Sequence, residues 1–360
     1  MSGGVDSSVA AAMLRDAGYD VVGITMKLWS EETDSARHHP CCLTEDVNDA
    51  RWVCQLLGIP HYVCSLEAEF QKYVVDYFCQ EYSRGRTPNP CLACNQHLKF
   101  HFLMKKALNL GAQYLATGHY ARIDHCDDKY RLLEAIDPSK DQSYVLYTLG
   151  QQELAHLLLP LGDCHKSEVR HLATRLGLPV ASKPDSQEVC FIPDGDCRSF
   201  ISRRFPQIPG DIIDSQGHLL GHHAGIAGYT IGQRQGLGLA SKRRLYVIDI
   251  NAQNNTLVVG GEEEIFSDTL WATQVHWVSG EAISKPIPVL AKIRYRSPKT
   301  EAVLWPQVNG VRLVFSKPQR AITPGQAVVF YQGDEVLGGG IIESARARMP
   351  SPELTGTLIN

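Results

Sequence analysis

The stretch SGGVDSS at residues 2–8 constrains the fold more than any other feature of the sequence. Two glycines let backbone N–H groups converge, and the stretch runs directly into a helical pattern from about Asp6 to Ala17. A loop of this kind at a helix N-terminus is an anion site that suits pyrophosphate. It lacks the lysine of a Walker P-loop and the spacing of a Rossmann GxGxxG. The alternative is structural, because Ser and Asp are ordinary helix caps and Gly-Gly is an ordinary turn.

The first 200 residues alternate between patterns typical of strands and of helices. Strands joined by long helical crossovers pair in parallel, so this part predicts an α/β domain over residues 1–200. Residues 141–178 are expected to stay helical, most clearly at 166–178. The expected strands are 21–29, 59–66 and 112–120, and the further expected helices are 45–58, 67–82 and 95–110.

Beyond residue 200 short alternating strands with frequent glycine dominate the pattern, as in a sandwich or barrel. We expect a small central β-rich domain at 201–270, a C-terminal β-barrel at 271–348 and a loose tail at 349–360. The expected strands are 245–250, 255–261, 287–296, 300–306, 311–315 and 326–342.

Charge and composition restrict the class of protein. The net charge of −4 argues against nonspecific polyanion binding, but residues 285–320 hold eight basic side chains against the single acid Glu301. The chain has neither a run of about 18 apolar residues nor a signal peptide, so we expect a cytoplasmic protein without a membrane partner. Its eleven cysteines are then expected to be thiols, with any disulfide catalytic.

Two distant cysteine segments suggest sulfur chemistry. Cys91 and Cys94 form a CxxC just before the helix expected from Asn95, a position that lowers the pKa of a thiol. Cys190 lies in the polar, turn-rich stretch SKPDSQEVCFIPDGD. Sulfur delivery needs one cysteine that accepts a persulfide and a second thiol that attacks or resolves it.

Metal binding is the alternative use of these thiols. Structural zinc is disfavoured, because the only other close cysteine pair is the adjacent Cys41 and Cys42. An iron–sulfur cluster on Cys91, Cys94 and Cys190 stays open, since three thiolates and one open iron could hold a sulfide.

Eight motifs, in order along nearly the whole chain, resemble those of the tRNA-specific 2-thiouridylases of the ATP-pyrophosphatase (PP-loop) superfamily. The resemblance implies an N-terminal adenine-nucleotide hydrolase-like domain. It also implies that ATP adenylates C2 of the wobble uridine of tRNA and that a persulfide sulfur displaces AMP. The motifs are SGGVDSS, GITMKLW, GRTPNPCLACN, ATGHYARI, KDQSYVL, DSQEVCFI, GYTIGQRQGLG and KIRYRS.

The resemblance makes Cys94 the nucleophile and Cys190 the persulfide carrier, with a transient disulfide between them. Because a disulfide needs Cα atoms within about 7 Å, we expect at least one of the two loops to move. Many members of the family carry Asp where this chain has Cys91, which puts a general acid/base role for this position in doubt and strengthens the cluster alternative.

The resemblance also assigns binding residues and partners. The partners are ATP with Mg²⁺, the tRNA anticodon stem-loop, and a persulfide donor or relay protein. Asp6 is the candidate Mg²⁺ ligand, with helix capping as its alternative. The implied ATP-binding residues are Met1, Ser2, Gly3, Gly4, Val5, Asp6, Ser7, Met26 and Gly118. The implied tRNA-binding residues are Asn89, Pro90 and Cys91 at the target base, His119, Lys140, Asp141, Gln142, Arg294, Tyr295 and Gln326.

The start of the chain departs from the family. Its members place an apolar strand of about six residues before the SGGVDSS loop, at the centre of the sheet, whereas only Met1 precedes the loop here. We expect the first strand to be missing and the true start to lie upstream. The alternatives to thiolation are an amidating PP-loop synthetase, which needs an ammonia source and has no use for Cys94 or Cys190, and a noncatalytic RNA-binding relative.

Overall fold

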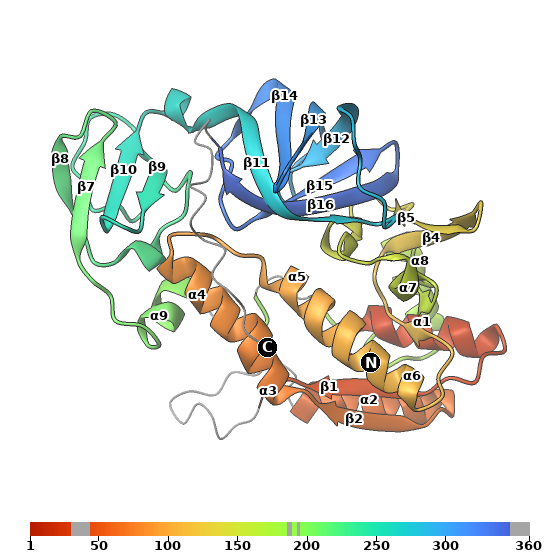
Figure 1. Ribbon diagram of the computed structural model, residues 1–360. Coiled ribbons are helices and arrows are strands. Elements are labelled where there is room, and N and C mark those ends of the chain that lie inside the picture. Colours follow the sequence, from red (N-terminus) through yellow and green to blue (C-terminus); the bar gives the residue numbers. More distant parts are fainter. Residues whose placement is uncertain (30–43, 186–188, 193–194, 346–360) are drawn as a thin grey trace.

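The computed structural model describes residues 1–29, 44–185, 189–192 and 195–345. Figure 1 shows a helix-rich N-terminal part, a small sheet at one end of the molecule, and a barrel that lies over the helices. This arrangement confirms the predicted α/β domain, central β-rich domain and C-terminal barrel. The tail predicted at 349–360 lies outside the described residues.

The N-terminal part contains two separate parallel strand pairs, β1 with β2 and β3 with β6. Helix α1 buries Val5, Val9 and Ala12, which recur at helical spacing. The elements are α1 (Val5–Asp16), β1 (Gly23–Lys27), α2 (Thr44–Leu57), β2 (His61–Ser65), α3 (Glu67–Phe70), the π-helix η2 (Gln71–Asp76), α4 (Tyr77–Ser83), α5 (Pro90–Ala93), the π-helix η3 (Cys94–Leu103), α6 (Met104–Asn109), β3 (Leu115–Ala116), β4 (Ala121–Cys126), β5 (Lys129–Glu134), η4 (Ser143–Leu146), α7 (Gln151–Leu154), β6 (Leu157–Leu158), α8 (Lys166–Arg175) and α9 (Cys197–Ser202).

Two predictions for this part are wrong in extent. The strand predicted at 112–120 has only two residues, and residues 141–178 are not one helix. The cause is the pair β3–β6: the Leu115 amide donates to the His156 carbonyl, so the apolar run after α7 joins a sheet instead of continuing a helix. The helices within that range are the short η4 and α7 and the longer α8.

The central part is a four-stranded sheet with the strand order β8-β7-β10-β9. Strands β7 and β10 pair in parallel, and the other neighbours pair antiparallel. Ile212, Val247 and Leu257 are completely buried beneath the sheet. The elements are β7 (Gly210–Asp214), β8 (Leu219–His223), η5 (Ile226–Gly228), β9 (Tyr246–Asn251), β10 (Thr256–Gly260) and η6 (Glu262–Ile265).

The C-terminal part is a closed six-stranded barrel, in which β16 pairs with β11 to complete the ring. Alternating residues of β13 and β14 face a core that includes Leu304, Leu313 and Phe330. The hairpin β4–β5, which the sequence patterns did not predict, extends this sheet through Leu133 opposite Glu335. The barrel strands are β11 (Phe266–Trp277), β12 (Ile287–Lys292), β13 (Thr300–Gln307), β14 (Gly310–Arg320), β15 (Ala327–Gln332) and β16 (Glu335–Ser344).

The segment 85–89, between α4 and α5, contacts all three parts. The Arg86 guanidinium lies 2.6 Å from a carboxylate oxygen of Glu81 and 2.6 Å from one of Glu343 in the barrel. The Thr87 amide donates to the Pro324 carbonyl at 2.9 Å. Gly85 has φ +71°, and a Cβ there would come within 2.5 Å of the Ile250 side chain in the central sheet. This segment therefore fixes the start of α5 relative to both other parts.

Replacing Arg86 by Ala leaves two largely buried carboxylates without their cation, so we expect Arg86→Ala to lower the thermal midpoint by roughly 5 °C. Arg84→Ala is the matched control, because the Arg84 side chain is 69% exposed and lies 3.5 Å from the same Glu81. Differential scanning calorimetry of both variants checks this. Equal midpoints for the two would contradict the role given to Arg86.

Candidate active site

The loop at residues 2–7 is shaped by its own hydrogen bonds and by a close approach to α2. The Ser2 amide donates to Ser7 Oγ at 3.1 Å, and Ser8 Oγ donates to the Gly4 carbonyl at 2.8 Å. Gly3 has φ +69°, and a Cβ there would lie 2.5 Å from the Asp46 carbonyl oxygen. Only glycine satisfies both conditions, which supports the anion-loop interpretation over that of an ordinary turn.

Two other residues predicted to bind ATP lie at the carboxyl ends of parallel strands, where ligands of such sheets bind. Gly118 follows β3, and a Cβ there would lie 2.8 Å from the Ser7 amide nitrogen. It therefore packs directly against the loop. Met26, the fourth residue of β1, is partly buried and packs against the apolar core.

Asp6 is engaged by a lysine that the sequence analysis missed. Both Asp6 carboxylate oxygens accept hydrogen bonds from Lys166 Nζ at 2.7 Å, and the Tyr120 hydroxyl donates to one of them at 2.8 Å. Burial and the Asp6 carboxylate raise the pKa of Tyr120, which keeps this hydroxyl a donor. In this structure Asp6 is the ion-pair partner of Lys166.

A second missed lysine holds the loop from the other side. Lys183 Nζ donates to the Gly3 carbonyl at 3.0 Å and to carboxylate oxygens of Asp46 and Asp49 on α2, each at 2.6 Å. Lys183 precedes Cys190 by seven positions. The chain that leads to Cys190 is therefore tied to the glycine loop.

Asp185 ties the same chain to the Asp6 side of the loop. Its carboxylate accepts from Lys140 at 2.8 Å and from Arg170 at 2.9 Å, and it lies 3.0 Å from Lys166 Nζ. Burial opposes ionisation of Asp185, but the hydrogen bonds from Lys140 and Lys166 outweigh it and lower the pKa to about 2. Lys140 was predicted to bind tRNA, and here it anchors the Cys190 segment.

After Cys190 the chain is anchored by an aromatic cluster. Phe191 is buried, and its ring centroid lies 5.7 Å from that of Phe70, 5.3 Å from that of Phe78 and 5.3 Å from that of Phe200. Cys190 itself is exposed. The thiol is thus presented between two anchored points of the chain.

The helix that carries the CxxC pair begins at Pro90, five residues before the predicted start. Asn89 caps it, because its side-chain oxygen accepts from the amides of Cys91 at 3.0 Å and Leu92 at 3.4 Å, and proline suits the first helical position. Cys91 is therefore in the first turn, and Cys94 opens η3. The turn residues of TPNP could have predicted this earlier start.

The pKa of the Cys91 thiol shifts in the direction opposite to the prediction. Desolvation by the surrounding protein, and next the neighbouring Cys190, raise it, while Lys99 acts in the opposite direction, and the residue itself is exposed. The Cys91 thiol is thus within electrostatic range of Cys190 and Lys99. Cys94 is half-buried one turn further along.

These thiols do not form a metal site in this conformation. Within the described ranges, no group of three or more His, Cys, Asp or Glu side chains is arranged to hold a metal ion. The cluster hypothesis for Cys91, Cys94 and Cys190 therefore finds no support in the geometry.

Tyr295 brings the barrel within electrostatic range of Cys91. Burial raises the pKa of Tyr295 to about 12, with further contributions from the nearby Asp141 and Cys91. Lys292 Nζ lies 3.8 Å from an Asp141 oxygen, and the rings of Tyr295 and Tyr144 are 6.0 Å apart. The loop after β12 therefore borders the same space as the CxxC helix.

His119 is buried at this site between two polar partners. Its Nδ1 is 2.8 Å from Thr117 Oγ1, and its Nε2 is 3.3 Å from Lys99 Nζ. Burial and the charge of Lys99 hold the pKa of His119 well below its usual value. His119 is therefore neutral, with Nε2 accepting from the lysine.

Other side chains predicted to contact tRNA form hydrogen bonds within the protein. The Gln326 amide donates to the carbonyls of Thr87 at 2.8 Å and Pro88 at 3.4 Å, so Gln326 positions the segment before Cys91. Three further side chains are engaged in the same way: Arg294 with Ala321 and with Thr323 Oγ1 at 2.9 Å, Asp141 with the amides of Ala135 and Ser143 at 3.1 and 3.2 Å, and Gln142 with the Tyr120 amide at 3.0 Å.

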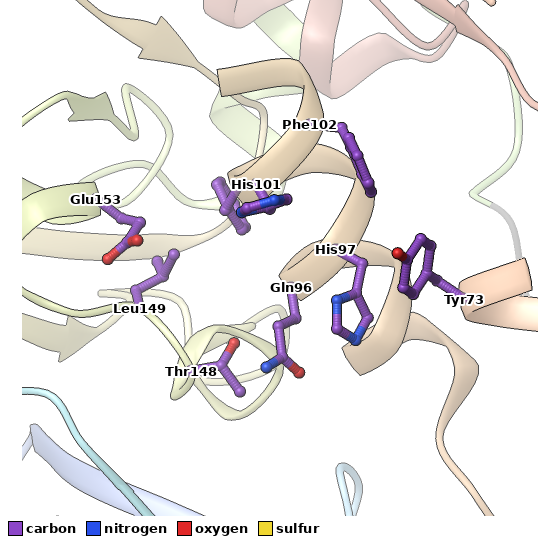
Figure 2. A pocket seen from close by; sticks show the side chains of 9 residues that line it. Tyr73, Gln96, His97, His101, Phe102, Thr148, Leu149 and Glu153 are labelled. Atoms are coloured by element: carbon purple, nitrogen blue, oxygen red, sulfur yellow. The ribbon is translucent and has the colours of Figure 1, made fainter. Parts of the chain in front are cut away.

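A pocket of about 350 Å³ lies further along η3 (Figure 2), away from the predicted site residues. His97 stacks on Tyr73 there, with ring centroids 5.0 Å apart, and Gln96 and Glu153 contribute polar groups. Burial, followed by the charge of His101, lowers the pKa of His97. The pocket contains neither the thiols nor the glycine loop.

Family models cover nearly all of the chain. The tRNA methyl transferase HUP domain matches residues 1–194, the tRNA methyl transferase PRC-barrel domain matches 198–261, and the aminomethyltransferase beta-barrel domain matches 267–342. A tRNA-specific 2-thiouridylase MnmA of Carboxydothermus hydrogenoformans is 51% identical over 350 residues, which are 95% of this chain and 96% of that protein. The chain belongs to the tRNA-specific 2-thiouridylase family. The family predicted from the eight motifs is thereby confirmed.

Further members support the same assignment. The 2-thiouridylase MnmA 1 of Caldanaerobacter subterraneus subsp. tengcongensis is 49% identical over 350 residues, with 95% of this chain and 96% of that protein covered. Among solved structures, the U34-tRNA thiolase NcsA from Methanococcus maripaludis with its 4Fe-4S cluster is 20% identical over 57% of this chain and 65% of that chain, with a TM-score of 0.32. A likeness this low carries no argument about the 2-thiouridylase site.

The contacts of Lys183 with the glycine loop predict an effect on nucleotide binding. Removing its side chain frees the Gly3 carbonyl and leaves two carboxylates beside the loop without their cation, so Lys183→Ala should raise the Kd for ATP by about tenfold. Lys105→Ala is the control, because Lys105 is exposed on α6. Isothermal titration with ATP measures both. An unchanged Kd for Lys183→Ala would show that this lysine does not hold the loop for nucleotide.

Proposed function

We propose that this chain is a sulfurtransferase that uses ATP to thiolate C2 of the wobble uridine in tRNA. One observation carries the proposal: the segment that presents Cys190 is fastened to the glycine loop through Lys183 and Asp185. The electrostatic effect of Cys190 on the Cys91 thiol supports a site shared by the ATP loop and the two thiol segments. An amidating synthetase has no use for that arrangement.

The reaction we propose begins with attack of the uridine O2 on the α-phosphate of ATP, which releases pyrophosphate and leaves an adenylated ring. The terminal sulfur of a Cys190 persulfide then forms a bond to C2, the C2–O bond breaks, and AMP departs with the oxygen. Adenylation makes this displacement feasible, because the oxygen would otherwise have to leave as hydroxide or water.

Cys94 completes the transfer. Its thiolate attacks Cys190 Sγ, the S–S bond to the transferred sulfur breaks, and the electron pair of that bond stays with the sulfur on C2. The products are 2-thiouridine and a Cys94–Cys190 disulfide, which a thiol reductant must open by two electrons before the next cycle. In the alternative order, Cys94 releases the sulfur as sulfide before it reaches C2.

The C-terminal barrel is proposed to hold the anticodon stem-loop, with the wobble base flipped toward Cys91 and Tyr295. The proposed site lies where Tyr295 of the barrel comes within electrostatic range of Cys91 in α5. We propose the domain division 1–200, 201–270 and 271–348. The proposed sulfur source is a persulfide donor or relay protein.

None of the described helices is long and apolar enough to cross a bilayer. We propose the cytoplasm as the place of the reaction.

The sulfur route predicts that Cys94→Ser and Cys190→Ser each reduce 2-thiouridine formation to background, because each removes one sulfur of the relay. Cys126→Ser should retain full activity, because Cys126 is an exposed thiol on β4. Mass spectrometry of nucleosides from tRNA of a complemented null strain measures all three. Normal 2-thiouridine with either Cys94→Ser or Cys190→Ser would refute the relay.

The proposed contact between Arg294 and a tRNA phosphate predicts that replacing Arg294 changes how tRNA binding depends on salt concentration. Arg294→Gln should weaken tRNA binding and reduce the slope of log K against log salt concentration by about one. Lys285→Gln is the control, since Lys285 is exposed in the loop between β11 and β12. Fluorescence anisotropy over a salt series gives both slopes. An unchanged slope would show that Arg294 does not contact a tRNA phosphate and makes only its observed hydrogen bonds to Ala321 and Thr323.

A further inference from the structure

Lys99 places a positive charge within electrostatic range of the Cys91 thiol. Its side chain is half-buried on η3, and Nζ lies 3.3 Å from Nε2 of the neutral His119. Within the part of the chain that the structure describes, no carboxylate lies within 4 Å of that Nζ. A half-buried ammonium whose partner is an uncharged imidazole stabilises the folded state little, which suggests that its charge serves another purpose.

The helical register of η3 brings Lys99 to the side of Cys94. In an α-helix, residue i+5 lies about 140° round the axis from residue i. Here the hydrogen bonds close at i+5, since the amide of Met104 donates to the Lys99 carbonyl, so each turn holds more residues. Lys99 is rotated back toward Cys94. π-Helical turns of this kind occur frequently at functional sites.

The groups around Lys99 all belong to the proposed reaction. Its charge acts on the Cys91 thiol and on His119, and Cys91 in turn is within electrostatic range of Cys190 and Tyr295. His119 holds the ammonium in place, because its other ring nitrogen is fixed by Thr117. The cation is therefore oriented by a neutral residue that does not cancel its charge.

The proposed chemistry brings negative charge to this position at two points. The adenylated uridine carries an anionic phosphate, and the attacking persulfide sulfur is an anion. Two anions that approach each other repel. A preorganised cation between them lowers this repulsion energy most when they are closest, in the transition state.

We propose that Lys99 is a catalytic residue whose ammonium contacts the adenylated uridine and stabilises the charge that accumulates as sulfur attacks C2 and AMP departs. Its role in this proposal is electrostatic, without proton transfer. This inference rests on the proposed function and deepens it, since it adds an electrostatic role to the sulfur transfer.

The test compares Lys99→Met, Lys99→Arg and the control Lys105→Met, because Lys105 is exposed on α6. Lys99→Met should lower kcat for 2-thiouridine formation by about 100-fold, with KM for ATP and tRNA within threefold and an unchanged thermal midpoint. Lys99→Arg, which keeps the charge, should recover at least tenfold of that loss. Lys105→Met should match the wild type.

Three results would overturn the proposal: a kcat for Lys99→Met within threefold of wild type, a rise in KM alone, or no recovery with arginine. If Lys99→Met does not fold, Lys99→Ala with added methylamine replaces it, and a rise in kcat with amine concentration supports the role while a flat response refutes it. Failure of the proposed function is distinguishable, because wild type and Lys105→Met would then form no 2-thiouridine.

Discussion

The position of the thiol helix depends on the Arg86 guanidinium, which lies between Glu81 of α4 and Glu343 of the barrel. One side chain thereby joins two parts of the chain separated by 257 positions. Because Arg86 immediately precedes the residues that start α5, its ion pairs fix the direction in which the CxxC helix leaves. Gln326 adds hydrogen bonds to the carbonyls of Thr87 and Pro88, so the barrel holds this segment at three successive residues.

The glycine loop depends on a second set of charges, supplied from residues 140–185. A Walker loop carries its own lysine, whereas this loop has Lys166 beside Asp6 and Lys183 beside Gly3. Lys166 is linked through Asp185 to the chain that presents Cys190, and Lys183 belongs to that chain. Nucleotide binding and presentation of the sulfur carrier therefore use the same ion pairs, which explains how an adenylation step and a sulfur transfer can share one small site.

Local patterns in the sequence predicted the architecture and the family. Helical spacing gave α1 and α8, and alternation gave most barrel strands. The sequence could not reveal the roles of Lys99, Lys166 and Lys183, because the fold decides whether a lysine has carboxylates beside it. The same holds for the Cys91 pKa: helix position alone predicted a lowered value, whereas desolvation and the neighbouring Cys190 raise it.

The central claim is that one sulfur atom passes from a persulfide through this site to C2 of a tRNA uridine at the expense of one ATP. The most direct measurement incubates the protein with ATP, unmodified tRNA and a ³⁴S-labelled persulfide donor, and follows nucleosides and nucleotides by mass spectrometry. The account predicts one labelled sulfur in 2-thiouridine for each AMP formed, and none without ATP. AMP formation without labelled 2-thiouridine, or label that appears without ATP, would contradict it.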